Sequence, residues 1–272
     1  MSSTKTGIEW TNATWNPMTG CTQISEGCDN CYALLLAQTK TRVVYLKHPP
    51  VKDTPQNRSN PFAPRFWENR LDQPLRWKKP MRIFVNSMSD VFHAHFTLEQ
   101  IRRVFDVMIA ADWHQFQVLT KRPERALRLA ETLPWAPNIW IGTSIENMNF
   151  AKRADALRQI RQASVRFISA EPLLGMLDTL NLEGIHWVIG GGESGPHFRP
   201  CRKEWAISLR DNCLAQGVKF FWKQWGGRTS KAGGRRLAGR FWNQYPVEHP
   251  VRRTSVIGAR RTSLVQTSAV VV

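Results

Sequence analysis

Short apolar runs, rich in aromatic and β-branched residues, alternate with amphipathic stretches along most of this 272-residue chain. Alternation of this kind indicates parallel β-strands joined by right-handed helical crossovers. Six runs are clear, at 82–85, 116–119, 139–141, 166–168, 187–189 and 219–222. Two further runs, 14–17 and 62–66, would give the eight strands of a closed barrel, whereas six or seven give a partial barrel or an open sheet. We therefore predict an α/β fold, a (β/α) barrel or partial barrel, with eight strands preferred.

The stretches between these runs carry apolar residues at helical spacing. The segment 97–111 has Thr97 as a candidate N-cap and places Ile101, Val104 and Met108 on one face. Further helices are expected at 30–40, 67–77, 123–131, 149–161 and 203–216, and Gly217 can end the last of them. Residues 48–61 are rich in Pro, Asn and Ser and are predicted to form a loop.

The composition changes after Trp225, where Gly, Arg and Ser replace the alternating pattern. We predict a barrel over residues 1–226, an ordered closing extension over 227–246 and a flexible basic tail over 247–272. Residues 227–272 hold nine basic residues and one acidic residue, which is about half of the net charge of +17. Such an excess favours an anionic partner such as a nucleic acid, although a solvated basic tail has the same composition.

The N-terminus shows no apolar run after its first lysine, and no segment is long and apolar enough to span a membrane. These features predict a cytoplasmic protein with no membrane partner. Disulfides are rare in that compartment, so three cysteines within eleven residues indicate a metal site or a catalytic site.

Polar and charged residues follow almost every apolar run, where parallel α/β folds keep their active sites. Solvent-exposed loops and helix N-caps would explain the serines and threonines that follow the runs. They explain less well why several charged residues follow the runs as well. Three consecutive glycines, 190–192, would let the backbone approach a ligand closely. The candidates for catalysis and substrate contact are Lys121, Arg122, Glu146, Glu171, Lys223 and Gln224, and those for cofactor contact are Asn86, Ser87, Asp90, Gly191, Gly192 and Glu193.

Cys21, Cys28 and Cys31 are separated by six and then two residues, whereas Cys201 and Cys213 are isolated. Three nearby thiolates bind soft or borderline metals. A structural zinc ion needs a fourth ligand, for which His48, His93 and His95 are candidates distant in sequence. A [4Fe-4S] cluster with three protein ligands leaves one iron open. That iron can chelate S-adenosyl-L-methionine, and electron transfer then yields a 5′-deoxyadenosyl radical. Placement after the first strand favours the cluster.

Longer motifs support a specific relationship. They are GIEWT (7–11), TWNP (14–17), GCDNCYA (27–33), FVNSMSDVFH (84–93), LTKRP (119–123), SAEPLLG (169–175), WVIGGGESG (187–195), FWKQWG (221–226) and WNQYP (242–246). With them the chain resembles the phage-associated three-cysteine-motif proteins, a radical-SAM-like family, over roughly residues 7–246.

The resemblance implies a barrel of the radical-SAM type and an iron–sulfur enzyme of phage or bacterial origin. It implies a [4Fe-4S] cluster at the three cysteines, with S-adenosyl-L-methionine as cofactor. The expected partners are a nucleic acid or another anionic substrate, and a partner protein encoded nearby. Two alternatives stay open. One is a zinc-stabilised nucleic-acid-binding protein without catalysis, and the other is a metal-independent barrel hydrolase or lyase that uses Glu171, Glu193 and Lys121.

Overall fold

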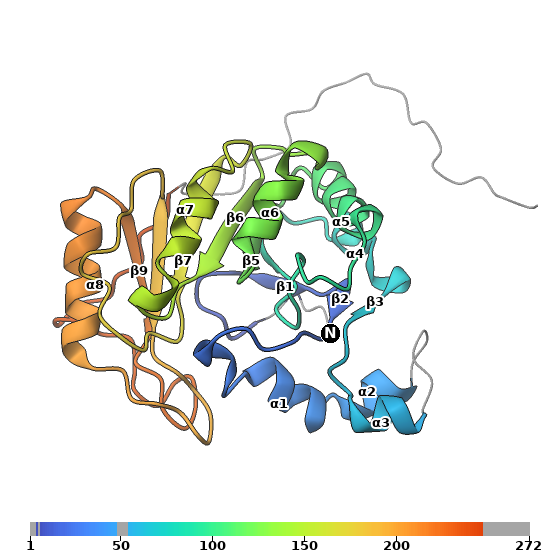
Figure 1. The fold of residues 1–272 in the computed structure, drawn as a ribbon, viewed down its shortest axis with the longest axis horizontal. Helices are drawn as coiled ribbons and strands as arrows, with labels where there is room; N and C mark the ends of the chain where they lie inside the picture. The colour runs from blue at the N-terminus through green and yellow to red at the C-terminus, as the bar shows by residue number, and fades with distance from the viewer. Residues whose placement is uncertain (1–3, 5, 48–53, 247–272) are drawn as a thin grey trace, which may run out of the picture.

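The computed structural model describes residues 4, 6–47 and 54–246 of the chain. Its centre is one parallel sheet of seven strands, which follow one another in chain order across the sheet (Figure 1). Within the described residues the two edge strands are not paired with each other, so the sheet is a partial barrel, one of the two predicted forms. The strands are β1 (Ala13–Trp15), β4 (Arg82–Val85), β5 (Gln115–Thr120), β6 (Ile139–Ser144), β7 (Val165–Ala170), β8 (Trp187–Gly191) and β9 (Lys219–Gln224).

The eighth strand predicted at 62–66 does not join this sheet. Only two residues are extended there, as β3 (Arg65–Phe66), and they pair antiparallel with β2 (Met18–Thr19). A strand enters a parallel sheet through a long crossover, but β3 instead lies directly against the segment that follows β1. The preference for eight strands was therefore wrong, and the run 14–17 contributes to the edge strand β1.

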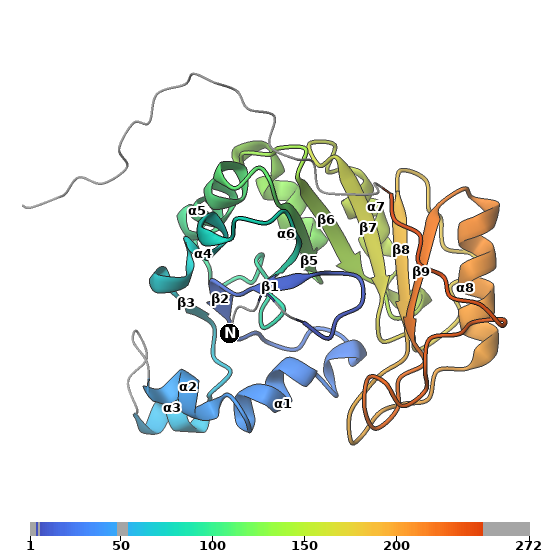
Figure 2. The same cartoon turned by 180° about the vertical axis from the view of Figure 1, so that it is seen from behind.

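Four helices occupy positions expected from the sequence, and three of them, α5 to α7, lie in front of the sheet in Figure 1 and behind it in Figure 2. Thr97 begins α5 in a capping box with Gln100. Gly217, with φ +70°, follows the last of the four. The region 67–77 holds less helix than predicted, namely a single 3₁₀ turn and α4 (Gln73–Arg76). The four helices are α5 (Leu98–Ala110), α6 (Pro123–Leu129), α7 (Lys152–Arg158) and α8 (Lys203–Ala215).

Three further helices, α1 (Tyr32–Gln38), α2 (Arg42–Lys47) and α3 (Pro55–Ser59), lie together below the sheet in both views. Of these, α1 lies within the helix predicted at 30–40. The loop predicted over 48–61 is wrong where α3 forms, and residues 48–53 lie outside the described residues. The Thr54 side chain accepts a hydrogen bond from the Asn57 backbone at 3.2 Å, and proline fits the first helical position. None of the helices that the structure describes could cross a membrane, because none is both long and apolar enough.

The sheet packs on both faces, because successive side chains of a strand point to opposite sides. On the outer face Ile141, Ile168 and Val188 pack with the helices. The inner face starts with an aromatic layer, and on β6 and β7 the next inward positions toward the carboxyl ends are Gly142 and Ser169. Gly142 makes room for the Phe167 ring, because a Cβ there would lie 2.4 Å from it. Aromatic rings thus form the floor of the half-barrel. The floor consists of Trp10, Phe84, Trp140, Phe167, Trp187 and Phe221.

The closing segment, residues 227–246, runs back along the outer edge of β9. The Trp222 N–H donates to the carbonyl of Trp242 at 2.9 Å, and the Gln244 N–H donates to the carbonyl of Phe220 at 3.2 Å. Phe221 and Asn243 form an antiparallel bridge between these bonds. The segment therefore satisfies backbone groups that an uncovered edge strand would leave unpaired.

The same segment spans the open side of the partial barrel. Lys231 forms an ion pair with Glu9 at 2.5 Å. The Arg82 guanidinium of β4 lies 4.0 Å from the ring of Tyr245, whose hydroxyl donates to the Glu9 carbonyl at 3.4 Å. The N-terminal segment and the closing segment thus hold the two edges together. The predicted tail, 247–272, lies outside the described residues, and the domain boundaries stay a prediction.

The closing segment turns sharply between Leu237 and Arg240, which form an isolated antiparallel bridge. Both residues between them have positive φ, +49° at Ala238 and +80° at Gly239. A two-residue turn with positive φ at both centres favours Asn, Asp or Gly, because a Cβ is strained there. Ala238 is therefore a strained position.

We expect Ala238→Asn to stabilise the protein, because asparagine tolerates the left-handed region better than alanine. The gain should be about 0.5–1 kcal/mol, with a higher Tm in thermal denaturation. Ala238→Val is the opposite control, since a β-branched residue is least compatible with positive φ and should lower the Tm. An unchanged Tm in both variants would contradict the assigned turn.

Candidate functional site

A cavity of about 640 Å³ opens at the carboxyl ends of the strands. It is bordered by the cysteine segment, by the ends of β4 to β9 and by the loops after them. Of the fifteen residues singled out from the sequence, all but Glu146 and Gly191 line it. The thirteen are Cys21, Cys28, Cys31, Asn86, Ser87, Asp90, Lys121, Arg122, Glu171, Gly192, Glu193, Lys223 and Gln224.

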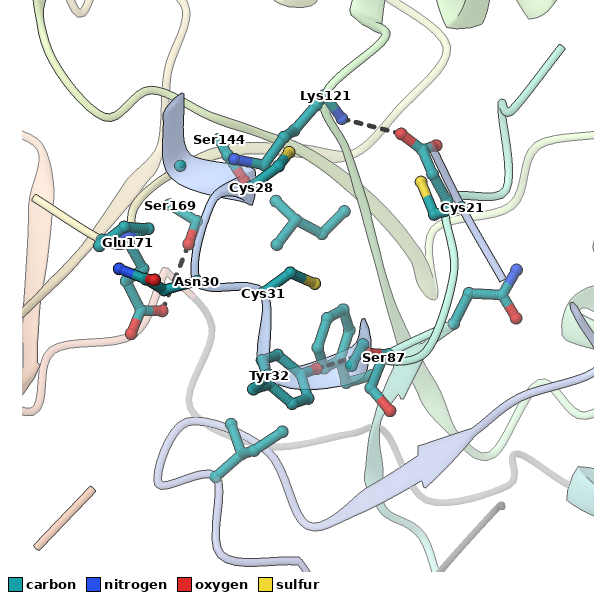
Figure 3. Close-up of a pocket in the computed structure, with 18 of the residues that line it drawn as sticks. Cys21, Cys28, Asn30, Cys31, Tyr32, Ser87, Lys121, Ser144, Ser169 and Glu171 are labelled. Carbon is teal, nitrogen blue, oxygen red and sulfur yellow. Dashed lines mark hydrogen bonds between the residues drawn. The ribbon is translucent and has the colours of Figure 1, made fainter. Parts of the chain in front are cut away.

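The three cysteines lie on one connection, from the end of β2 to the start of α1. Gly20 begins it with φ +85°, and a Cβ there would lie 2.1 Å from the Ala63 carbonyl oxygen, so only glycine fits. Cys28 ends a 3₁₀ turn, and Cys31 is the N-cap of α1. Figure 3 shows the three thiols on different sides of one hollow. Within the described ranges no group of three or more His, Cys, Asp or Glu is placed to hold a single metal ion.

Glu146 lies beneath the cysteine segment rather than in the cavity. Its side chain is completely buried between two cations, Lys121 and Arg153, with Arg153 at 3.0 Å. Ser25 of the cysteine segment donates to the same carboxylate at 2.8 Å. A Cβ on Gly27 would lie 2.3 Å from a carboxylate oxygen of Glu146, so the segment rests directly on it. The carboxylate therefore joins the cysteine segment to the ends of β5 and β6 and to α7.

We expect Glu146→Gln to destabilise the protein strongly, because it leaves two buried cations without a counter-charge. Breaking a buried pair of this kind costs about 3–5 kcal/mol. Urea denaturation measures it, and Asp155→Asn is the matched control, because Asp155 pairs with Arg158 while 65% exposed. Exposed pairs contribute less than about 1 kcal/mol. Equal losses of unfolding free energy in the two variants would show that the Glu146 carboxylate does not stabilise the fold as a buried ion pair.

A second ion pair, Asp90 with Arg122, fixes the other side of the cysteine segment. The two side chains are 2.9 Å apart, and the Asp90 carboxylate also accepts from the Thr120 hydroxyl at 2.7 Å. Arg122 reaches the Cys21 sulfur at 3.7 Å and the Thr22 carbonyl at 3.2 Å. Asp90 thus orients Arg122, and Arg122 holds the first cysteine.

Glu193 ties the loop after β8 to the same segment. Its carboxylate accepts from Asn30 at 2.9 Å and from the Arg199 guanidinium at 2.6 Å. Arg199 also pairs with Asp29 at 3.2 Å and donates to the Glu26 carbonyl at 2.9 Å. Burial raises the pKa of Glu193, but the hydrogen bonds from Arg199 and Asn30 outweigh it, and the pKa is lowered. The ionised carboxylate of Glu193 therefore links the loop after β8 to the cysteine segment.

The last charged pair on the cavity wall is Glu171 with Lys223, at 2.8 Å. Gly191 lies behind it, since a Cβ there would lie 2.8 Å from a Glu171 carboxylate oxygen. Gly192 allows a second close approach, because its Cβ would lie 2.0 Å from the carbonyl oxygen of Trp225. The predicted glycine run therefore serves close packing between the loops after β7, β8 and β9.

Besides Oε1 of Glu171, which lies in the ion pair with Lys223, three polar atoms of cavity-lining residues are buried and have no hydrogen-bond partner within the described chain. They are Nε1 of Trp10, Nδ2 of Asn86 and Oε1 of Gln224. All three side chains are at least nine-tenths buried. Buried polar groups normally have partners, so these two donors and one acceptor are open to water or to a bound molecule in the cavity.

The three cysteine thiols differ in acidity. Burial raises the pKa of Cys28, but Lys121 and nearby hydrogen bonds outweigh it, and the pKa is lowered. Burial, assisted by Asp90, raises the pKa of Cys21 to about 11, and burial also raises the pKa of Cys31. Of the three thiols, only that of Cys28 has a lowered pKa, so Cys28 is the one most readily ionised.

We expect Cys28 to be alkylated first when the metal-free protein meets iodoacetamide at pH 8. The thiolate reacts, and a thiol with a pKa near 11 is ionised in only about one molecule in a thousand at that pH. As the pH is increased, the alkylation rate of Cys28 should begin to rise at a lower pH than the alkylation rate of Cys21. Mass spectrometry of peptides measures both, and Cys201, with a pKa raised by burial to about 12, is the slow control. Faster reaction at Cys21 would contradict the assigned environments.

Several residues of this site were not singled out from the sequence. Ser25 and Asn30 lie between the cysteines, and that position was the available signal. Arg153 lies in a helix and Arg199 in a loop, and no local pattern distinguishes them from other surface arginines. Trp10 precedes the first strand, where an isolated tryptophan reads as a core residue.

Comparison with known proteins places the chain in a family. Residues 5–246 match the family model described as "Protein of unknown function (DUF5131)", and the chain belongs to that family. The matched range is nearly the same as residues 7–246, over which the sequence motifs show the resemblance. No curated protein matches the chain.

Solved structures of spore photoproduct lyase are similar at a low level. The structure with dinucleoside spore photoproduct has a TM-score of 0.47 and 12% identity, over 75% of this chain and 61% of that one. A mutant of the same lyase has a TM-score of 0.44 and 13% identity, over 77% and 64%. This chain thus spans less than two thirds of these proteins, and its function has to be argued from its own site.

Proposed function

We propose that the protein is a radical-SAM-like iron–sulfur enzyme that acts on a nucleic acid or another anionic substrate. In this proposal Cys21, Cys28 and Cys31 hold a [4Fe-4S] cluster. The observation that carries it is the placement of three thiols of one connection around a single cavity, at the carboxyl ends of a parallel half-barrel. That edge is where parallel α/β folds carry out their chemistry.

The donor set fits the cluster. Three thiolates satisfy three irons of a four-iron cluster and leave the fourth open. The three thiols lie around one hollow at the mouth of the half-barrel. When bound, the cluster with S-adenosyl-L-methionine would supply a 5′-deoxyadenosyl radical.

In this proposal the other residues of the site hold the cysteine segment in place and orient a bound molecule. Glu146 and Arg122 fix the cysteine segment from two sides. The unpaired polar atoms of Asn86, Gln224 and Trp10 are available to a bound molecule. Trp10 and Phe84 of the aromatic floor give the cavity an apolar base. The ion pair of Lys223 with Glu171 lies on the cavity wall, where its ammonium and carboxylate groups are within reach of a bound molecule.

The zinc alternative needs a fourth ligand near the cysteines. His93 is a candidate, because its Nε2 is 3.0 Å from the hydroxyl of Thr22, next to Cys21. His48 lies outside the described residues. Its Nδ1 accepts from the His95 backbone at 3.1 Å, so Nε2 carries the proton and donates to Thr22. Both nitrogens are in use, and no observation favours zinc over the cluster.

The metal-independent alternative needs a carboxylate free to act as a general base. Glu193 is held by Arg199 and Asn30, and Glu171 is paired with Lys223. Lys121 is committed to Glu146. These pairings suit structural roles better than acid–base catalysis.

The setting we propose follows the sequence resemblance. It is a phage or bacterial enzyme with a partner protein encoded nearby. A cytoplasmic location fits the proposal because cluster ligation needs reduced thiols.

The test is anaerobic reconstitution with iron and sulfide, followed by counting iron and zinc per chain. We expect about four irons in the wild type, as one cluster of this class requires, and a loss of most of them in Cys28→Ala. Cys201→Ala is the matched control and should keep its iron, because Cys201 lies apart from the three cysteines. After reduction with S-adenosyl-L-methionine, the loaded protein should release 5′-deoxyadenosine.

One tightly held zinc ion with no uptake of iron would overturn the proposal. Uptake of iron that Cys28→Ala does not diminish would overturn the ligand assignment.

A further inference from the structure

The closing segment, residues 227–246, carries a strong positive charge that the site does not use. It contains five basic residues and no acidic residue. Two of them are structural, because Lys231 pairs with Glu9 and Arg235 donates to the Lys223 carbonyl at 2.9 Å. The remaining three are exposed, and none pairs with a carboxylate in the described part of the chain. They are Arg228, Arg236 and Arg240.

Two of these guanidinium groups are held against aromatic rings. Arg240 lies 3.6 Å from the ring of Trp242, and Arg236 lies 5.0 Å from the ring of Phe241. Arg236 also donates to the Gly239 carbonyl at 3.0 Å. Stacking fixes the plane of a guanidinium and leaves N–H groups at its edge for a phosphate. The entropy lost when such an arginine binds is therefore smaller than for a free side chain.

Phe241 adds a different kind of contact. Its side chain is 53% exposed, although phenylalanine is usually buried. An exposed ring beside unpaired arginines is the combination that binds single-stranded nucleic acids, because each base can stack on the ring. A duplex keeps its bases stacked inside and offers no face to such a ring.

The segment also leads to the cavity. Ser230 lines the cavity, and Arg235 is anchored to Lys223, which lines it as well. An anionic strand bound along the segment would therefore run beside the cavity wall.

We propose that Arg228, Arg236, Arg240 and Phe241, which we call the arginine surface, bind single-stranded nucleic acid through its phosphates and one stacked base. The inference rests on the proposed function in taking a nucleic acid as the substrate class. It goes beyond that function in assigning the surface and the single-stranded form.

The turn at Ala238 allows a test that does not endanger the fold. Asparagine and aspartate have nearly the same shape, and both tolerate the positive φ of this position. Ala238→Asp places a carboxylate between Arg236 and Arg240, whereas Ala238→Asn adds no charge. A difference between the two variants therefore reports charge and not folding.

The probe is a fluorescein-labelled single-stranded dT20, with binding to the full chain followed by anisotropy from 50 to 200 mM salt. We expect Ala238→Asp to weaken binding at least about fivefold and Ala238→Asn to change it less than about twofold, as a charge effect on phosphate contacts predicts. The double variant R236Q/R240Q should lower the slope of log K against log salt by about 1.4, or about 0.7 per lost contact. Phe241→Leu should weaken binding to dT20 more than binding to a duplex of equal length.

The matched control is R102Q/R128Q, which removes the same charge from exposed positions of α5 and α6, on the opposite side of the molecule (Figure 1). It should leave the affinity almost unchanged. Equal binding by Ala238→Asp and Ala238→Asn, or an equal effect of the control, would overturn the arginine surface.

Iron counted on the same samples separates the two proposals. Wild-type protein that takes up no iron, yet distinguishes aspartate from asparagine at position 238, would support the surface and overturn the enzyme. Iron-loaded protein whose variants all bind dT20 alike would overturn the surface alone.

Discussion

The buried carboxylate of Glu146 is the charge on which the arrangement of the site depends. It is compensated by Lys121 from the end of β5 and Arg153 from α7, and it accepts a hydrogen bond from Ser25. Because a buried charge is unfavourable without its partners, these segments stay together. A connection with little regular structure is thereby tied to the sheet and to α7, and Gly27 lets its backbone approach the Glu146 carboxylate.

The sheet and its outer helices could be predicted because their signals are local. An apolar run followed by an amphipathic stretch reports a strand and its crossover wherever it occurs. The segment 62–66 has the same local appearance as a strand, but its partner is decided by the hairpin with β2. Likewise, prolines near 55 looked like loop residues, although Pro55 after Thr54 suits a helix start. Both errors concern the partner or cap of a segment and not its composition.

Much of the cavity wall could also be predicted, because carboxyl ends of neighbouring parallel strands must converge. What the sequence could not show is which charges neutralise one another. Glu193 was a candidate for cofactor contact, and its carboxylate is occupied by Arg199, for which no local signal exists. Conversely, Asn86 and Gln224 keep polar atoms without partners. Pairing is a property of the folded chain, and it separates groups that hold the site from groups open to a ligand.

The long sequence separations within the site have a consequence for the order of events during synthesis. Ser25 precedes its partner Glu146 by 121 residues, and Asn30 precedes Glu193 by 163. At a translation rate of about 5–20 residues per second, the cysteine connection leaves the ribosome on the order of ten seconds before the residues that clasp it. During that interval its thiols are exposed and have no neighbours to orient them. The cysteine connection gains its last clasping residue, Arg199, and the cavity its last strand end, Gln224, only late in synthesis. Loading of the proposed cluster therefore belongs to the completed chain, and a chain truncated before residue 199 would carry the cysteines without the residues that hold them in place.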